Sequence, residues 1–200
     1  VGWVLSVSVI AVSSLVWLEG LKWSLARVSS YRLFPLLGLL AFGLMWVHYI
    51  VAAIKKLTKS KQPTHKYFEV TSFVVLVLIL MHPGMLVAGL WRDGYGLPPK
   101  SYLENYIPPG LWWATLLGTI SLIAFLVYEL RRWYKDKSWW KFVQYTTDIA
   151  MVAIIVHGFK LGNHLDSGWF QIVWAFYAVT YLVSLSIIYI YISQREVSSG

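Results

Sequence analysis

The chain contains no cysteine, and only 13% of its residues are charged. The lack of cysteine excludes disulfide bonds, cysteine-ligated iron–sulfur clusters and thiolate chemistry. A soluble domain carries about 25% charged residues, so the scarcity of charge argues against a soluble fold. No segment alternates polar and apolar residues with a period of two, which argues against a membrane barrel. No glycine-rich dinucleotide-binding turn is present either, so any oxidation of a nicotinamide cofactor must occur on a partner.

Apolar residues instead make up 58% of the chain and collect in six long runs. A helix needs about 20 predominantly apolar residues to cross a bilayer. The pattern therefore predicts an all-α membrane protein, a single domain built as a six-helix transmembrane bundle. The expected spans are about residues 1–18, 33–54, 67–90, 111–130, 142–161 and 169–192. We expect a multi-pass protein of the cell's inner or plasma membrane, with lipid around its outer surface.

The basic residues indicate the orientation of this bundle. The net charge of +8 does not indicate a nucleic-acid partner, because the charges lie in short loops between the apolar runs. The loop after the second run carries Lys55, Lys56, Lys59, Lys61 and Lys66, and the loop after the fourth carries Arg131, Arg132, Lys135, Lys137 and Lys141. Cytoplasmic loops of membrane proteins are enriched in Lys and Arg. Both of these loops, and with them both termini, are therefore predicted to be cytoplasmic.

Two histidines occupy matched positions in the third and fifth runs. His82 lies 16 residues after Lys66, and His157 lies 16 residues after Lys141. In a six-span bundle these two helices run in the same direction, so each histidine lies roughly 24 Å of helix rise from its cytoplasmic lysine. Ionisable residues are costly inside a bilayer and usually mark functional sites. Two imidazoles at equal depth are suited to holding a flat macrocycle from both of its faces.

We predict that His82 and His157 are the two iron ligands of one b-type haem. Iron with two imidazole ligands has no open axial position, which is typical of an electron carrier. Two other interpretations stay open. The histidines form hydrogen bonds between helices, or they bind zinc, although no third and fourth ligand is evident at that depth.

The residues near each histidine fit a haem. Gly84 and Gly158 follow the two histidines closely, and glycine lets a bulky group approach the backbone. Arg92 and Lys160 lie further outward, where the haem propionates would point. These two cations are the candidate propionate partners.

The third and fifth runs resemble the ferric-reductase-like transmembrane domain family. The resemblance lies in the segments HKYFEVTSFVVLVLILMHPGMLVAG and WWKFVQYTTDIAMVAIIVHGFKLG, and it covers about residues 31–192. The family includes ferric reductases, the membrane domain of NADPH oxidases, the STEAP metalloreductases and the haem-binding membrane subunit of bacterial methionine sulfoxide reductase. The resemblance implies six spans, haem histidines on the third and fifth of them, and electron transfer across the membrane.

The chain departs from the two-haem members of that family at the inner haem. Those members carry a further histidine 13 or 14 residues before each outer one. Here the earlier of these positions hold Phe68 and Val143, and the later hold Glu69 and Gln144. The inner haem therefore looks absent, and the chain is expected to be a single-haem variant similar to the metalloreductases.

Three polar residues are candidates for a different inner site. Glu69 and Gln144 lie at one level and either bond each other or meet a flavin, unless Glu69 reaches the cytoplasmic lysines. His48 either lines a quinone or flavin pocket or forms a hydrogen bond between helices. Asp148, deeper in the fifth run, either pairs with a neighbouring span or relays a proton.

The expected function is one-electron transfer from a cytoplasmic donor to an outer acceptor. The donor is FAD or FMN on a cytoplasmic flavoprotein, or a membrane quinol, and the acceptor is a small oxidant or an outer redox partner. The chain would then be the membrane component of an oxidoreductase whose electrons come from that partner. The alternative is a cofactor-free transporter, or a scaffold subunit of a larger membrane complex.

Overall fold

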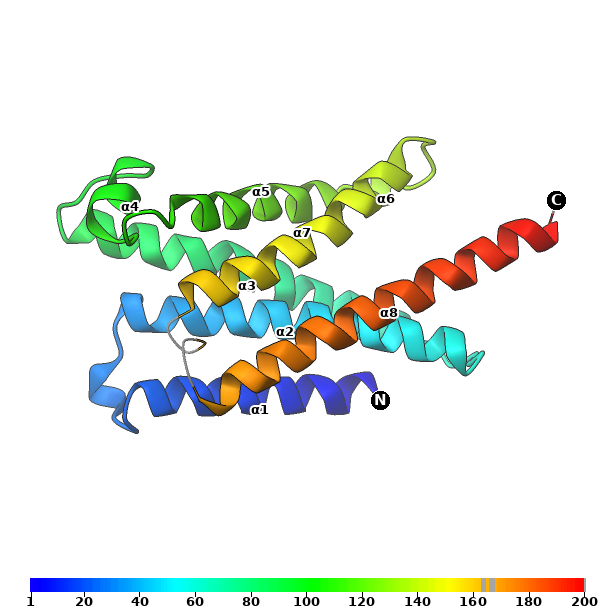
Figure 1. Ribbon diagram of the computed structural model, residues 1–200, viewed down its shortest axis with the longest axis horizontal. Helices are drawn as coiled ribbons and strands as arrows, with labels where there is room; N and C mark the ends of the chain where they lie inside the picture. The colour runs from blue at the N-terminus through cyan, green and yellow to red at the C-terminus, as the bar shows by residue number, and fades with distance from the viewer. Residues whose placement is uncertain (163–164, 166–167, 200) are drawn as a thin grey trace.

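The computed structural model describes residues 1–162, 165 and 168–199, and every regular element in that part of the chain is helical (Figure 1). This confirms the predicted all-α class. The elements in chain order are α1 (Gly2–Gly20), the short 3-10 turn η1 (Leu25–Arg27), α2 (Ser30–Leu57), α3 (His65–Arg92), α4 (Lys100–Asn105), α5 (Trp112–Tyr128), α6 (Arg131–Tyr134), α7 (Trp140–Leu161) and α8 (Trp169–Ser199).

Five of the described helices are long and apolar enough to cross a membrane: α1, α2, α3, α7 and α8. Each coincides with one of the predicted runs, and its ends lie within a few residues of the predicted ends, apart from the longer C-terminal end of α8. The remaining run forms α5, which is shorter at 17 residues. At 1.5 Å per residue it measures about 26 Å, near the lower limit for crossing a hydrocarbon core of about 30 Å.

The helices pack mainly as two antiparallel pairs, α2 with α3 and α5 with α7, and α1 and α8 pack against α2. More than half of the most apolar stretch of α2 is buried, compared with 22% in each of the other four long helices. Helix α2 is thus the centre of the bundle. The outer helices keep exposed apolar faces, as expected of surfaces that meet lipid.

Figure 1 shows which connections share an end of the bundle. The two chain termini, the connection from α2 to α3, and α6 lie toward one end, which we call the α6 end. The connection from α1 to α2, together with α4 and the start of α5, lies at the other, which we call the α4 end. Helices α3 and α7 both run from the α6 end toward the α4 end, so the two histidines lie on helices of the same direction.

Aromatic side chains fill the contact between α2 and α8. The ring centroids of Trp46 and Tyr177 are 4.6 Å apart, and those of Phe42 and Trp174 are 4.3 Å apart. The Trp46 Nε1–H also donates to Thr180 Oγ1 at 2.9 Å. Because an indole N–H needs a partner when buried, this bond lets a tryptophan occupy the core of the bundle.

Candidate functional site

The imidazole of His82 is held by helix α2. Its Nδ1 lies 2.7 Å from the carbonyl oxygen of Phe34. A carbonyl oxygen only accepts, so Nδ1 carries the proton and Nε2 keeps a free lone pair. Gly38, one turn further along α2, lies directly against the ring: a Cβ built there would be 2.8 Å from His82 Cε1.

The imidazole of His157 is held by helix α5 in the same way. Its Nδ1 lies 2.8 Å from the carbonyl oxygen of Ala114. A Cβ built on Gly118 would be 2.7 Å from His157 Cε1. In both pairs the accepting carbonyl is four residues before the glycine, and both segments end in Leu-Leu-Gly (FPLLG and ATLLG). The pairs α2–α3 and α5–α7 thus orient a histidine by the same arrangement of a carbonyl acceptor and a glycine.

This arrangement is the one that metal-ligating histidines use. Such histidines almost always donate their second ring N–H to a carbonyl or carboxylate, which fixes the tautomer and the ring orientation. His82 and His157 each use Nδ1 for this bond and keep Nε2 without a hydrogen-bond partner among the described residues.

The available ligand side chains limit which metal centre the two histidines could hold. No group of three or more histidine, cysteine or acidic side chains that could hold a metal ion occurs among the described residues. Zinc in protein sites takes three or four protein ligands, so it fits poorly. A haem iron already has four porphyrin nitrogens and needs only two axial ligands. Two oriented imidazoles fit that requirement.

The glycines that follow the histidines in sequence have other roles than the one expected. Gly84 lies on an exposed face of α3, where a Cβ would meet no atom within 4 Å. It lines a shallow apolar groove of about 340 Å³ with Leu80, Met81, Met85 and Ala88. A Cβ on Gly158 would be 2.5 Å from Trp174 Cζ2, so this glycine makes room for the Trp174 side chain of α8. Close approach to the histidines comes from the neighbouring helices.

The two candidate propionate partners are on the surface. Arg92 ends α3, where its Nε lies 3.1 Å from Asp93 Oδ1 and its Nη2 lies 3.5 Å from Ser30 Oγ. Lys160 is exposed in the last turn of α7. Tyr31 donates to Asp93 Oδ2 at 2.7 Å. This hydrogen bond is the largest cause of the lowered pKa of Asp93, and the hydrogen bond from Arg92 is the next largest. Arg92 is therefore engaged by a carboxylate of its own chain.

The three candidates for an inner pocket are not brought together in the part of the chain that the structure describes. His48 Nε2 lies 2.6 Å from Thr71 Oγ1 on α3, which is the hydrogen bond between helices weighed above. Glu69 lies 3.6 Å from His65 on the same exposed face of α3. Gln144 is exposed on α7. The fifth histidine of the chain, His164, lies outside the described residues.

Asp148 accepts hydrogen bonds from three tyrosines of two other helices. Tyr49 of α2 donates to its Oδ1 at 2.6 Å, and Tyr189 of α8 donates to its Oδ2. Tyr181 of α8 donates to its backbone oxygen at 2.8 Å. Asp148 therefore pairs with neighbouring helices, the first of the two alternatives for it, and joins α2, α7 and α8.

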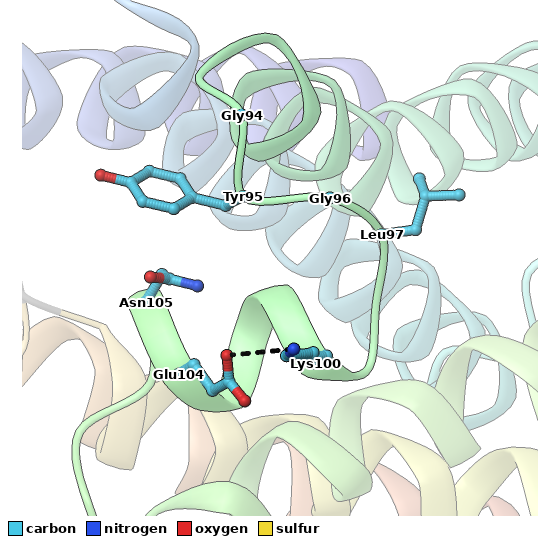
Figure 2. Close-up of a pocket in the computed structure, with 7 residues that line it drawn as sticks. All are labelled: Gly94, Tyr95, Gly96, Leu97, Lys100, Glu104 and Asn105. Atoms are coloured by element: carbon cyan, nitrogen blue, oxygen red, sulfur yellow. Dashed lines mark ion pairs between the residues drawn. The ribbon is translucent and has the colours of Figure 1, made fainter.

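A polar pocket of about 470 Å³ opens at the α4 end (Figure 2). It lies between the segment 94–97 and α4, where Lys100 Nζ is 4.0 Å from Glu104 Oε2. The two glycines of that segment, Gly94 and Gly96, have φ values of +85° and +78°, which glycine adopts without strain. Their tight turn lets the chain fold back over the end of α3.

Sequence reasoning missed the groups that orient the histidines. The accepting carbonyls of Phe34 and Ala114 carry no sequence signature, because every residue has one. Gly38 and Gly118 do carry a signal, the repeated Leu-Leu-Gly at similar positions in the second and fourth apolar runs. That repeat becomes informative only when the histidines are known to lie beside it.

Fold and site together define the class of protein: in its described residues it is all-helical, with five helices long and apolar enough to span a membrane and two histidines oriented in the same way. Comparison of the chain with models of known protein families, with curated proteins and with solved structures finds no match. The function is therefore argued from the site itself.

Proposed function

We propose that this protein carries single electrons across a membrane through one b-type haem held by His82 and His157. The observation that carries the proposal is the duplicated bond from histidine Nδ1 to a backbone carbonyl, with its adjoining glycine, on helices of the same direction. A histidine that served only as a bond between helices needs one such contact. It does not need its second nitrogen free, nor a partner arranged in the same way.

The imidazoles of His82 and His157 would hold the haem, which would supply a one-electron redox centre. The chain's own part is orientation. The Phe34 and Ala114 carbonyls hold the imidazole protons on Nδ1, which leaves Nε2 for iron and increases its basicity. Gly38 and Gly118 let α2 and α5 approach the rings without a clashing Cβ. The apolar helices around the site keep water away from it.

The proposed topology has six spans, with α5 as the sixth membrane-crossing helix. Its close antiparallel packing against α7 supports this, and so does the bond from Ser121 Oγ to the Ala150 carbonyl at 3.2 Å. With six spans, the α6 end, its two basic loops and both termini are cytoplasmic. The α4 end is then the outer end, and the haem lies in the outer half of the bilayer.

The electrons enter from the cytoplasmic side in this proposal. The donor is a flavin on a cytoplasmic flavoprotein or a membrane quinol, and the acceptor is an outer oxidant or redox protein. This is the direction of transfer in ferric-reductase-like proteins, which the sequences of helices α3 and α7 resemble. His48 is hydrogen-bonded to Thr71, and Glu69 lies near His65 on an exposed face. A flavin or quinone that used His48 at the inner side would need to displace its bond to Thr71.

A difference spectrum of the detergent-purified protein tests the proposal. Dithionite-reduced minus oxidised spectra are recorded for the wild type and for His82→Ala and His157→Ala. We expect a b-type α-band, with about one haem per chain, that is lost in both variants. His65→Ala is the matched control, because His65 is exposed on α3 and should leave the band unchanged.

A colourless wild type that stays colourless when haem is supplied during expression would contradict the proposal. It would favour a cofactor-free transporter or a scaffold subunit. A band that survives in either histidine variant would show that haem binds elsewhere.

A further inference from the structure

Two buried hydroxyls have no hydrogen-bond partner in the part of the chain that the structure describes. They are Ser101 Oγ on α4 and Thr115 Oγ1 on α5. Ser101 is fully buried, and the hydroxyl oxygen of Thr115 is buried although the residue is partly exposed. A buried polar group without a partner destabilises the fold, so most buried polar groups are paired. A buried hydroxyl without a partner in the protein therefore calls for an explanation, and a water, an ion or a polar ligand group can supply the missing partner.

Both hydroxyls lie close to the backbone groups that orient the two histidines. Thr115 directly follows Ala114, whose carbonyl accepts from His157. Ser101 directly precedes Tyr102, which packs against the buried cluster of Phe34, and the Phe34 carbonyl accepts from His82. Figure 1 shows α4 and the start of α5 at the same end of the bundle. The two hydroxyls thus lie at the α4 end of the bundle, on α4 and at the start of α5.

We propose that Ser101 and Thr115 bind the carboxylate edge of the tetrapyrrole that His82 and His157 hold, each hydroxyl donating to one propionate. The inference rests on the proposed haem and names the groups that set its orientation. A hydroxyl is a donor to a carboxylate, and hydrogen bonds to charged acceptors are stronger than neutral ones. This site replaces Arg92 and Lys160 as direct partners, because Arg92 is engaged by Asp93 and both are exposed.

The charge of the propionates is offset at the same end of the bundle. Lys100, which is exposed and lies 4.0 Å from Glu104, directly precedes Ser101, and Lys160 lies in the last turn of α7. These cations add positive potential near the carboxylates without needing to touch them.

The proposal predicts effects of opposite sign with and without ligand. In the apoprotein, Ser101→Ala and Thr115→Val remove an unpaired buried hydroxyl, so the stability is unchanged or raised. In the haem-loaded protein, the same changes remove a donor, so haem binds more weakly. A hydroxyl with a structural role alone would lower apoprotein stability when removed.

The experiment titrates the full-length apoprotein in detergent with protohaem and with protohaem dimethyl ester, whose carboxylates are esterified. Dissociation constants are read from the absorbance of the bound haem. We expect the wild type to bind protohaem at least tenfold more tightly than the ester. In the Ser101→Ala/Thr115→Val double variant this preference should fall to less than threefold, through weaker binding of protohaem.

Three variants complete the test. Thr115→Ser retains a hydroxyl and should retain the preference for protohaem. Thr119→Val on α5 and Ser8→Ala on α1 remove exposed hydroxyls that already bond backbone carbonyls, and they should leave the preference unchanged. Thermal unfolding of each apoprotein shows the sign of the stability effect.

The outcomes separate the two proposals. A wild type that binds neither compound overturns the haem proposal itself. A wild type that binds both compounds equally, or a double variant that keeps the preference, overturns the carboxylate site while the haem proposal stands. A double variant whose apoprotein is less stable than the wild type also overturns it, because the hydroxyls then serve the fold.

Discussion

The two histidines differ from other polar residues of the bundle in how their rings are held. His48 also lies between helices, but its Nε2 is occupied by Thr71. His82 and His157 instead use Nδ1 for the bond to a backbone carbonyl. In all three rings one nitrogen is hydrogen-bonded, and in His82 and His157 the nitrogen left available is Nε2, which lies farther from the backbone than Nδ1.

Substitution of the glycines against the histidine rings tests this arrangement. We predict that Gly38→Ala and Gly118→Ala lower protein stability by about 1–3 kcal/mol, the usual cost of overpacking, because the new Cβ lies under 3 Å from the imidazole. Both changes should also weaken haem binding. Thermal unfolding and haem titration measure the two effects.

The matched control for the glycines is Gly84→Ala, where a Cβ meets no atom within 4 Å. It should leave stability unchanged or raise it by about 0.5–1 kcal/mol, because alanine is favoured over glycine within a helix. Equal losses in all three variants would show that the histidine contacts are not the cause.

The Tyr31–Asp93 bond predicts a pH effect at the α4 end. It is the main reason that the pKa of Asp93 lies below its ordinary value of 3.8. A carboxyl with a depressed pKa stabilises the fold above its ordinary pKa, and this contribution is lost as the pH falls through the depressed value. Tyr31→Phe should raise the pKa of Asp93 toward 3.8, so the stabilising contribution becomes smaller and its loss is complete at a higher pH. Carboxyl carbon chemical shifts, followed by NMR against pH, measure this, and an unchanged titration in Tyr31→Phe would contradict it.

At the scale of helices, the described bundle is held by two kinds of contact. Helices α2 and α3, like α5 and α7, pack closely along their lengths, whereas α7 and α8 have little direct packing. Asp148 bridges this looser junction through tyrosines of α2 and α8. A paired carboxylate at this position joins three helices that apolar packing alone joins less firmly.

A double-mutant cycle tests the bridge. Tyr49→Phe leaves one oxygen of Asp148 without its donor, so it should destabilise the protein by about 1–3 kcal/mol. In an Asp148→Asn background the same change should cost less, because a neutral acceptor forms a weaker bond. Unfolding in detergent gives the coupling free energy.

Tyr95→Phe is the control for this cycle, because Tyr95 is exposed in the loop that follows α3. It should have little effect in either background. Additive effects of Tyr49→Phe and Asp148→Asn would show that the bond does not contribute to stability.

At the scale of the whole molecule, the proposed topology follows from the distribution of charge. The basic loops lie together at the α6 end, and the pocket and α4 lie at the other (Figure 1). Since the chain has no cysteine, single cysteines can be introduced without a background signal.

Labelling of intact cells with a membrane-impermeant maleimide should modify Leu103→Cys at the α4 end. It should not modify Gln62→Cys or Asp136→Cys at the α6 end until the cells are opened. Modification of Gln62→Cys and Asp136→Cys on opposite sides of the membrane would show that α5 does not cross it, and would exclude the six-span proposal.

The helices themselves follow from local properties of the chain. A run of apolar residues of sufficient length forms a helix in a membrane whatever its neighbours are, because the backbone must satisfy its own hydrogen bonds there. The sequence alone therefore identifies the positions of the runs. It also gives the matched spacing of His82 and His157 from the preceding lysines. The prediction that the two histidines lie at equal depth needed only counting along two helices of equal rise.

The sequence by itself determined the helical class, the extent of the apolar helices and the two histidines worth examining. Only the tertiary structure decided that α2 is the central helix, that Gly38 and Gly118 face the histidines, and that tyrosines hold Asp148. It also decided that Ser101 and Thr115 are buried without partners. Each of these depends on which helices are neighbours and how they are rotated. Those choices are set by contacts between residues far apart in the chain, and the apolar pattern, which is similar on every helix, does not encode them.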